Sequence, residues 1–247
     1  METSKYNWFN TGHAAIFDKS TFETLWTSFP LVYYDDFLGA WLAIPAVGAA
    51  ESGCDWSCRD TGAATEIKLA DHSGGAVRLL FTVAAAEQEA LLYQADNRNF
   101  DVTHGLIFET KIRVNTLPTL QTEIQFGLGD DYVQGGFDNL TFQMGFDLDG
   151  SGLVYVRKDD DTSDQTVTTG ITLDAGNEYI FRIDCTDVTD IKFFIDGVQV
   201  ASATAFPYVA TGADAVLQPY FSVYKAAAST GEGIMTIDYV KIWMNRS

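Results

Sequence analysis

The chain has 247 residues, of which 47% are hydrophobic and 13% aromatic, with 21 glycines and only 5 prolines. This composition predicts a folded protein with a sizeable core and excludes a disordered chain. The sequence carries 34 Asp and Glu residues against 15 Lys and Arg residues, a formal net charge of −19. Nucleic acids and anionic membranes attract clustered cations, so we expect neither as a partner.

The start of the chain does not read as a targeting signal. Residues 1–9 are polar and aromatic, without a basic start followed by an apolar run. The longest weakly polar run, residues 37–50, is too short to cross a bilayer and contains glycine and proline. We therefore expect cytoplasmic synthesis and no membrane span.

Residues 1–30 mix aromatic and polar side chains without steady alternation and end at a proline. This pattern predicts an N-terminal arm outside the main strand pattern. Two interpretations remain open: the arm packs on its own domain, or its aromatic side chains contact a neighbouring subunit. The candidates for contact with a partner are Trp8, Phe9, Phe17 and Trp26.

From Leu31 onward, strand patterns repeat with turn residues between them. The predicted strands are residues 32–37, 76–84, 105–114, 122–127, 140–146 and 153–158. In the third of these, every second residue from Phe108 to Val114 takes one face and the charged residues between them take the other. Residues 84–93 are ambiguous, because their composition suits a helix although they lie between strands.

The C-terminal third continues the strand pattern. Tyr179, Phe181 and Ile183 alternate with Arg182 and Asp184, and Asp196-Gly197 predicts a hairpin turn. Residues 220–224 and 240–243 are apolar on nearly both sides, as expected for central strands that are covered on both faces. The prediction is an all-β protein: a two-sheet antiparallel jelly-roll β-sandwich over residues 31–247, preceded by the arm.

Three cysteines cannot make a complete disulfide framework. Cys185 is in strand phase with Phe181 and Ile183, which predicts a buried thiol. Cys54 and Cys58 flank Asp-Trp-Ser and could pair, bind a metal with a distant histidine, or remain reduced. We favour reduced thiols, because structural zinc usually has four ligands at tighter paired spacings.

Several short segments in order resemble a known family. They are Tyr34-Asp35-Asp36-Phe37, Asn99-Phe100-Asp101-Val102-Thr103, Gly105-Leu106-Ile107-Phe108-Glu109, Phe181-Arg182-Ile183-Asp184, Phe194-Ile195-Asp196-Gly197, Gln218-Pro219-Tyr220-Phe221-Ser222-Val223 and Asp238-Tyr239-Val240-Lys241-Ile242-Trp243. Together they are similar to the concanavalin A-like lectin and glucanase superfamily, and within it to the concanavalin-like proteins of tailed phages.

The resemblance implies a noncatalytic structural or adhesive protein of a phage particle, such as a capsid decoration or head-surface protein. Its expected partners are other virion proteins such as the capsid protein, host-surface glycans, and further copies of itself. The expected location is the virion, assembled in the host cytoplasm. The acidity and the unpaired thiol are compatible with such assembly. A free carbohydrate-binding lectin is the first alternative.

A glycoside hydrolase is the second alternative. Glucanases of the superfamily carry a strand that reads roughly E-x-D-x-x-E, because retaining hydrolysis needs a nucleophile and a general acid across the scissile bond. The nearest segments here are Glu87-Gln88-Glu89, which lacks a third acid, and Glu123-Ile124-Gln125, whose glutamine cannot act as nucleophile or acid. We therefore expect no enzyme activity, with a displaced set of Glu87, Glu89 and Glu109 as the alternative.

Two loops contain candidate ligand-binding residues. In residues 145–152, Asp147 and Asp149 resemble the start of a calcium loop, but the chain resumes as a strand where a bidentate glutamate would follow. This favours a hairpin and no cofactor, with calcium as the alternative. The second loop contains the acid, amide and aromatic groups of a lectin sugar site, which makes its residues candidates for glycan or partner binding: Asp130, Asp131, Tyr132, Phe137 and Asn139.

Overall fold

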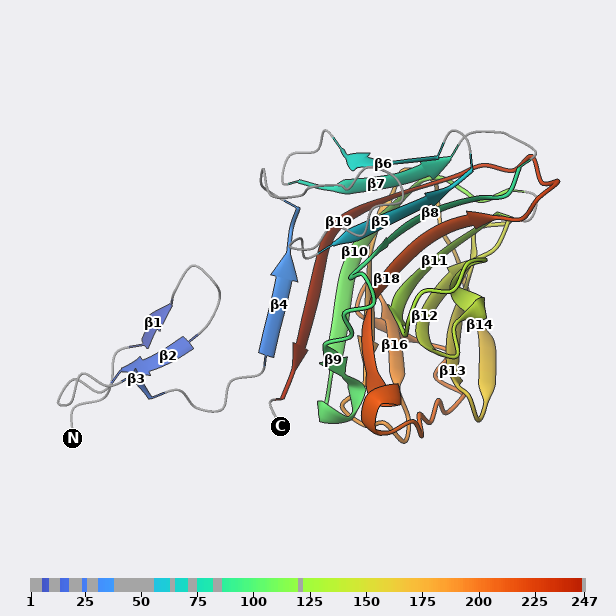
Figure 1. The fold of residues 1–247 in the computed structure, drawn as a ribbon. Helices are drawn as coiled ribbons and strands as arrows, with labels where there is room; N and C mark the ends of the chain where they lie inside the picture. The colour runs from blue at the N-terminus through green and yellow to red at the C-terminus, as the bar shows by residue number, and fades with distance from the viewer. Residues whose placement is uncertain are drawn as a thin grey trace.

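The computed structural model describes residues 6–8, 14–17, 24–25, 31–37, 56–62, 65–70, 75–81, 86–119 and 122–245. Antiparallel strands form two eight-stranded sheets that pack face to face as a β-sandwich (Figure 1). This confirms the predicted all-β, two-sheet fold. None of the helical turns in the described ranges is long and apolar enough to span a bilayer.

Sheet 1 has the strand order β17-β16-β15-β10-β19-β7-β6, with β4 paired to the C-terminal half of β19. Its strands are β4 (Leu31–Asp35), β6 (Thr65–Leu69), β7 (Val77–Phe81), β10 (Ile107–Thr116), β15 (Glu178–Asp184), β16 (Lys192–Ile195), β17 (Val198–Val200) and β19 (Gly233–Met244). β4 and β7 therefore lie one after the other along the same edge of β19.

Sheet 2 has the order β14-β13-β12-β11-β18-β8-β5, with β9 paired to the start of β18. Its strands are β5 (Ser57–Thr61), β8 (Gln88–Tyr93), β9 (Phe100–Asp101), β11 (Thr122–Gly129), β12 (Phe142–Leu148), β13 (Leu153–Asp160), β14 (Asp164–Thr172) and β18 (Val216–Lys225). The remaining elements are the mutually paired β1 (Tyr6–Trp8), β2 (Ala14–Phe17) and β3 (Thr24–Leu25), and the turns η1 (Val102–His104), η2 (Phe137–Asn139) and η3 (Gly212–Ala215).

The core lies between the sheets and is built by alternate residues of each strand. Phe126 and Phe146 of sheet 2 meet Phe181 of sheet 1 edge to face, with ring centroids 4.7 and 4.9 Å apart. All three side chains are fully buried. Each buried phenylalanine contributes roughly 1.5–3 kcal/mol through the hydrophobic effect, so this contact between the sheets is a major source of stability.

Most predicted strands are present at the expected places, including the hairpin of β16 and β17. Its turn residues Asp196 and Gly197 both have positive φ, +49° and +77°, as a two-residue hairpin turn requires. The ambiguous segment 84–93 contains β8, which is buried on both faces. Within the two sheets, β5, β6, β9 and β14 were not predicted, and neither were β1, β2 and β3 of the arm. The side chains of the N-terminal arm, and with them Trp8, Phe9, Phe17 and Trp26, lie outside the described residues.

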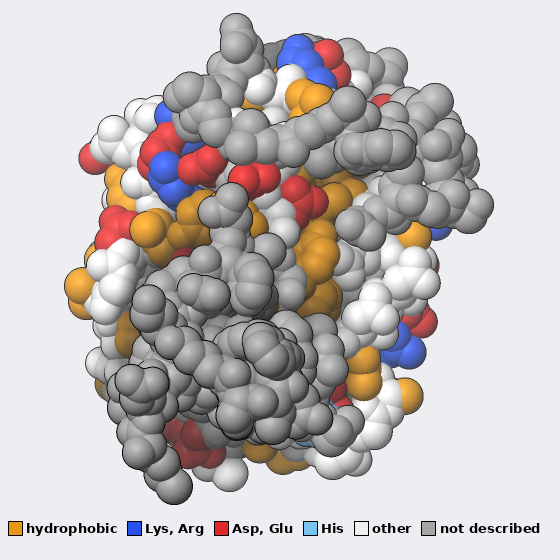
Figure 2. Space-filling view, turned by 90° about the vertical axis from the view of Figure 1, so that its left-hand side faces the viewer, with side chains coloured by type: hydrophobic (Ala, Val, Ile, Leu, Met, Phe, Trp, Pro, Cys, Tyr) orange, Lys and Arg blue, Asp and Glu red, His pale blue; other side chains and the backbone are white. Residues whose placement is uncertain are grey.

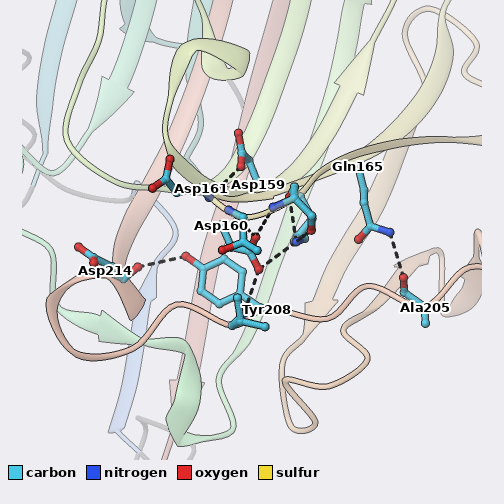
Figure 3. Close-up of polar contacts among 11 residues, drawn as sticks. Asp159, Asp160, Asp161, Gln165, Ala205, Tyr208 and Asp214 are labelled. Atoms are coloured by element: carbon cyan, nitrogen blue, oxygen red, sulfur yellow. Dashed lines mark hydrogen bonds and ion pairs between the residues drawn. The ribbon is translucent and has the colours of Figure 1, made fainter.

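A buried ion pair fastens one end of sheet 2 to the segment before η3. Lys158 Nζ lies 3.0 Å from Asp160 Oδ2, and both side chains are almost completely buried. The same carboxylate accepts hydrogen bonds from the backbone N–H groups of Ser163 and Val209, at 2.9 Å each. Figure 3 shows Asp160 between the β13–β14 turn and the segment that carries Tyr208. The charges are therefore satisfied by partners from both segments.

Candidate binding surface on the outer face of sheet 2

A loop of residues 130–141, between β11 and β12, folds back over the outer face of sheet 2. The floor beneath it consists of glycines. A Cβ atom on Gly145 would lie 2.9 Å from the ring of Phe137, and one on Gly129 would lie 2.5 Å from Leu140 Cδ1. The glycines therefore make the room in which the loop side chains lie on the sheet.

Phe137 anchors the loop. Its side chain is fully buried, and its backbone N–H donates a 2.6 Å hydrogen bond to Gln125 Oε1 on β11. It belongs to a small hydrophobic cluster separate from the main core: Leu91, Tyr93, Phe137, Leu140 and Tyr220. The Phe137 side chain has no exposed surface in this structure, and it holds the loop on the sheet.

Tyr132 connects the loop to strands β8 and β5. Its hydroxyl donates a 2.8 Å hydrogen bond to Glu89 Oε2, and its backbone N–H donates one of 2.8 Å to Asp96 Oδ1. The guanidinium of Arg59 lies 4.3 Å from the centre of the Tyr132 ring, within the range of a cation–π interaction. The Nε–H of Arg59 also donates a 2.8 Å hydrogen bond to the hydroxyl of Tyr93. One face of Tyr132 is therefore occupied by a cation.

Glu89 is a carboxyl group with no exposed surface. Burial raises its pKa from 4.5 to about 7, although hydrogen bonds from the Tyr132 hydroxyl and the Gly136 backbone lower it, and the nearby Glu87 adds to the rise. The Oε1 atom of Glu89 has no hydrogen-bond partner among the described residues. Glu89 is therefore a proton-binding group held under the loop near neutral pH.

The rim of the loop carries exposed polar groups in fixed positions. Asp131 makes an ion pair with Arg98 at 3.2 Å, and its side chain is 61% exposed. Asn139 is exposed, and its amide donates a 3.1 Å hydrogen bond to the carbonyl oxygen of Gln134. Gln134, also exposed, donates one of 3.1 Å to Glu87. The rim thus presents carboxylate and amide groups that are already oriented.

Asp130 closes the base of the loop. Its backbone N–H donates to the carbonyl oxygen of Phe142 at 2.9 Å, and its carboxylate accepts from the Phe142 N–H at 3.2 Å. Partial burial raises the pKa of Asp130 to about 6. Of the predicted site residues, Asp131, Tyr132 and Asn139 have exposed groups on one surface, whereas Asp130 and Phe137 support the loop from its two ends.

Sequence reasoning missed Arg59, Tyr93 and Gln125 as parts of this surface, and it considered Glu89 only as a catalytic acid. A signal was present, because the polar pair Gln88-Glu89 begins the otherwise apolar β8, and the glycines of β11 and β12 indicate close approach to another part of the chain. Neither signal shows which segment covers the face.

The structure separates the carboxylates of the hydrolase alternative. Glu89 lies on β8 of sheet 2, whereas Glu109 lies on β10 of sheet 1. Phe108, the neighbour of Glu109 in the chain, belongs to the core between the two sheets. Glu109 instead accepts a 3.0 Å hydrogen bond from the Tyr239 hydroxyl. Glu89 and Glu109 therefore belong to different sheets of the sandwich. Glu87 and Glu89 are neighbours, but the loop covers Glu89.

The predicted hairpin of residues 145–152 is present, and its carboxylates have protein partners. Asp149 Oδ1 accepts hydrogen bonds from the N–H and hydroxyl of Ser151, at 2.8 and 2.6 Å. Asp147 Oδ2 lies 2.9 Å from Arg157 Nε. Within the described ranges, no group of three or more His, Cys, Asp or Glu side chains is arranged to hold a metal ion.

Cys58 and Cys185 are both free, buried thiols. This confirms the prediction for Cys185, whose thiol donates to the sulfur of Met144 at 3.3 Å. Burial raises the pKa of Cys185 well above its ordinary value, and that of Cys58 to about 12. Cys54 lies outside the described residues.

Comparisons with known proteins support the fold. No protein-family model matches the sequence, and no curated protein matches it. A protein of unknown function from Shewanella oneidensis MR-1 has a similar structure, with a TM-score of 0.59 and 12% identity over 92% of this chain and 91% of that one. The carbohydrate recognition domain of Emp46p, in a potassium-bound form, gives a TM-score of 0.51 and 13% identity over 78% and 90%.

The binding domain of botulinum neurotoxin DC, in complex with SialylT, is also similar, with a TM-score of 0.50 and 11% identity. The match covers 78% of this chain but only 44% of the toxin chain. At these identities, the similarity establishes a lectin-type β-sandwich fold.

Proposed function

We propose that the protein is a noncatalytic adhesive module that binds glycans at the rim of loop 130–141. The observation that carries this proposal is the fixed position of the exposed groups on Asp131, Gln134 and Asn139 beside the half-buried Tyr132. Sugar hydroxyls pair with carboxylates and amides, and apolar sugar faces pack on aromatic rings, so a few oriented polar groups next to an aromatic side chain suit such a ligand.

Two features support the proposal. The loop is anchored by the half-buried Asp130 at one end and by the buried Phe137 near the other, so little ordering entropy is lost when a ligand binds. The fold is also similar to that of a carbohydrate recognition domain and to that of a toxin binding domain in complex with SialylT.

A glycan array followed by titration of the best ligand tests the proposal. We expect Asp131→Ala and Asn139→Ala each to weaken binding about tenfold or more, because each removes a hydrogen-bonding group at the rim. Glu66→Ala is the matched control: Glu66 is an exposed carboxylate paired with Lys68 on β6 of the other sheet, and its loss should leave the affinity unchanged. Unchanged affinity in both rim variants would contradict the assignment of the site.

The proposal that the module is noncatalytic rests on the burial of Glu89 and its separation from Glu109. We expect no release of reducing ends from β-glucans by the native protein. Release that disappears in both Glu87→Gln and Glu89→Gln would support the hydrolase instead, with Glu89 acting as the protonated acid after loop movement.

A second candidate function is a structural role on a tailed-phage particle, bound to other virion proteins such as the capsid protein. The motif resemblance suggests it, and the outer face of sheet 1 supports it. One cross-strand row on that face combines aromatic and charged residues from five adjacent strands: Tyr34, Lys241, Glu109, Arg182 and Phe194.

Such a mixture suits a protein interface, where aromatic residues and arginine are enriched. Arg182 lies 4.6 Å from the centre of the Phe194 ring, and Tyr34 is 56% exposed. Figure 2, which views the side of the molecule where β4 lies in Figure 1, shows hydrophobic side chains next to acidic and basic ones. Mass spectrometry of purified phage particles is the test, and absence of the chain from them would contradict this role.

A further inference from the structure

Residues 131–136 form a flap between two fixed points of loop 130–141. At one end, the backbone N–H of Asp130 is bonded to Phe142, and its carbonyl oxygen accepts a 2.7 Å hydrogen bond from Gln218 Nε2. At the other end, Phe137 is fully buried. Gly135 and Gly136 lie just before Phe137 with φ of +111° and +98°, a conformation open mainly to glycine. The flap can therefore turn at these glycines while both anchors stay in place.

The flap is attached to the sheet by side-chain contacts and by two backbone N–H groups, that of Tyr132 to Asp96 and that of Gly136 to Glu89. Tyr132 is bonded to Glu89 and lies against Arg59, and Gln134 is bonded to Glu87. Beneath the flap, Glu89 Oε1 and the hydroxyl of Tyr220 are buried and have no hydrogen-bond partner among the described residues. Burying an unsatisfied polar atom is unfavourable, and the penalty is far larger for a charged one. The closed position of the flap is therefore compatible with a neutral Glu89 carboxyl, whereas ionisation of this carboxyl makes the closed position less favourable.

We propose that the flap is latched shut by the neutral carboxyl of Glu89 and released when this carboxyl loses its proton, which uncovers a floor that includes Tyr93 and Tyr220. The latch thereby adds regulation to the proposed glycan surface. The effect on glycan binding rests on the proposed function, whereas the movement of the flap does not.

The groups that face Glu89 decide the direction of the effect. Burial and the neighbouring Glu87 favour its neutral form. Arg59 on β5, the Tyr132 hydroxyl and the Gly136 N–H favour its anion. From β18, Tyr224 is its cross-strand neighbour and Tyr220 lies close enough to interact with it electrostatically. Because Arg59 is also engaged by Tyr93 and Tyr132, it compensates for only part of the desolvation.

The sign of the pH dependence follows. The pKa of Glu89 is about 7 under the closed flap and falls toward the ordinary 4.5 when the carboxyl is solvated. Closure is therefore most favourable below pH 4.5, weakens between pH 4.5 and 7, and is weakest above pH 7. One unit of pKa difference is a tenfold change in the equilibrium, so raising the pH from 5 to 8 should favour opening by roughly 10- to 100-fold.

Amide hydrogen exchange of the full chain, followed by mass spectrometry at pH 5 and pH 8, tests the latch. After correction for the chemical exchange rate, we expect the protection of residues 131–136 to fall by roughly 10- to 100-fold between the two pH values. Protection of β11 should stay constant and serves as the internal reference.

Three variants make the test specific. Glu89→Gln keeps an oxygen for the Tyr132 hydroxyl but cannot ionise, so its flap protection should be the same at both pH values. Glu66→Gln, at an exposed carboxylate on β6 of the other sheet, is the matched control and should keep the fall. Tyr132→Phe removes the hydrogen bond and should lower protection at pH 5. The proposal is overturned if native protection does not change with pH, or if Glu89→Gln shows the same fall as the native protein.

Glycan titration at the two pH values separates this inference from the proposed function. If the flap responds to pH but no glycan binds at either value, the latch is supported and the glycan proposal fails. If a glycan binds at the rim with the same flap protection at both values, the latch fails and the glycan proposal stands.

Discussion

The ring of Phe137 occupies the space that a side chain on Gly145 would need. A Cβ atom at residue 145 would come within 2.9 Å of two ring carbons of Phe137 and within 2.4 Å of the carbonyl oxygen of Phe126. Gly145 lies on β12, and Phe137 comes from the loop that precedes this strand. The glycine thus allows the loop to lie flat on its own sheet, and the candidate binding surface depends on this contact.

Gly145→Ala should destabilise the protein by roughly 1–3 kcal/mol, because the added methyl group overpacks a tight contact. Urea unfolding measures the loss, and hydrogen exchange should show it first in residues 130–141. Thr166→Ala on the exposed edge strand β14 is the control, expected within about 0.5 kcal/mol of the native protein. A Gly145→Ala protein of native stability would show that the loop does not rest on this floor.

Lys158→Ala should cost about 3–5 kcal/mol, since it leaves the buried carboxylate of Asp160 without its cation. The paired variant Lys158→Met with Asp160→Asn should lose much less, because no uncompensated charge stays buried. Urea unfolding of both variants gives the comparison. Equal losses in the two variants would mean that packing, and not charge, holds this end of the sandwich.

The same ion pair predicts a loss of stability in acid. Burial tends to raise the pKa of Asp160, but hydrogen bonds from Val209 and Ser163 and the contact with Lys158 outweigh it and hold the pKa below its ordinary value of 3.8. This contribution is therefore present above pH 3.8 and is lost as the pH falls through the lower folded-state value. Unfolding free energies measured from pH 5 to pH 2 should decline less in Asp160→Asn than in the native protein.

Cys58 and Cys185 should react slowly with a thiol reagent in the native protein and rapidly after unfolding. Both are buried, and their raised pKa values keep the reactive thiolate scarce. The measurement is the rate of disulfide exchange with an aromatic disulfide in a Cys54→Ser variant, with and without denaturant. Fast labelling of either thiol in the native variant would show that these strands open readily.

Calcium should not stabilise the protein through residues 147–149. Asp149 Oδ1 already accepts hydrogen bonds from the Ser151 side chain and backbone, and Asp147 is paired with Arg157. Thermal unfolding with calcium and with a chelator should give the same midpoint, because only a ligand selective for the folded state raises it. A midpoint that rises with calcium and does not rise in Asp149→Ala would instead support the calcium alternative.

The sequence alone determined the two-sheet sandwich, because a side-chain period of two is a local property of each strand. The alternation around Phe108 and Phe181, and the Asp196-Gly197 turn, appear in the structure as they appear in the sequence. The acid, amide and aromatic groups of residues 130–139 were likewise visible, since loops with such composition are recognisable without coordinates.

Only the tertiary structure decided which of these groups are exposed. Glu89 is charged or polar and Phe137 is apolar, but both side chains are completely buried. The reason is that loop 130–141 folds over β8 and over the glycines of β11 and β12. The same covering made β8 a strand that is buried on both faces, which its helix-like composition did not reveal. Burial depends on segments distant in the chain, and a local pattern contains no information about what will lie above it.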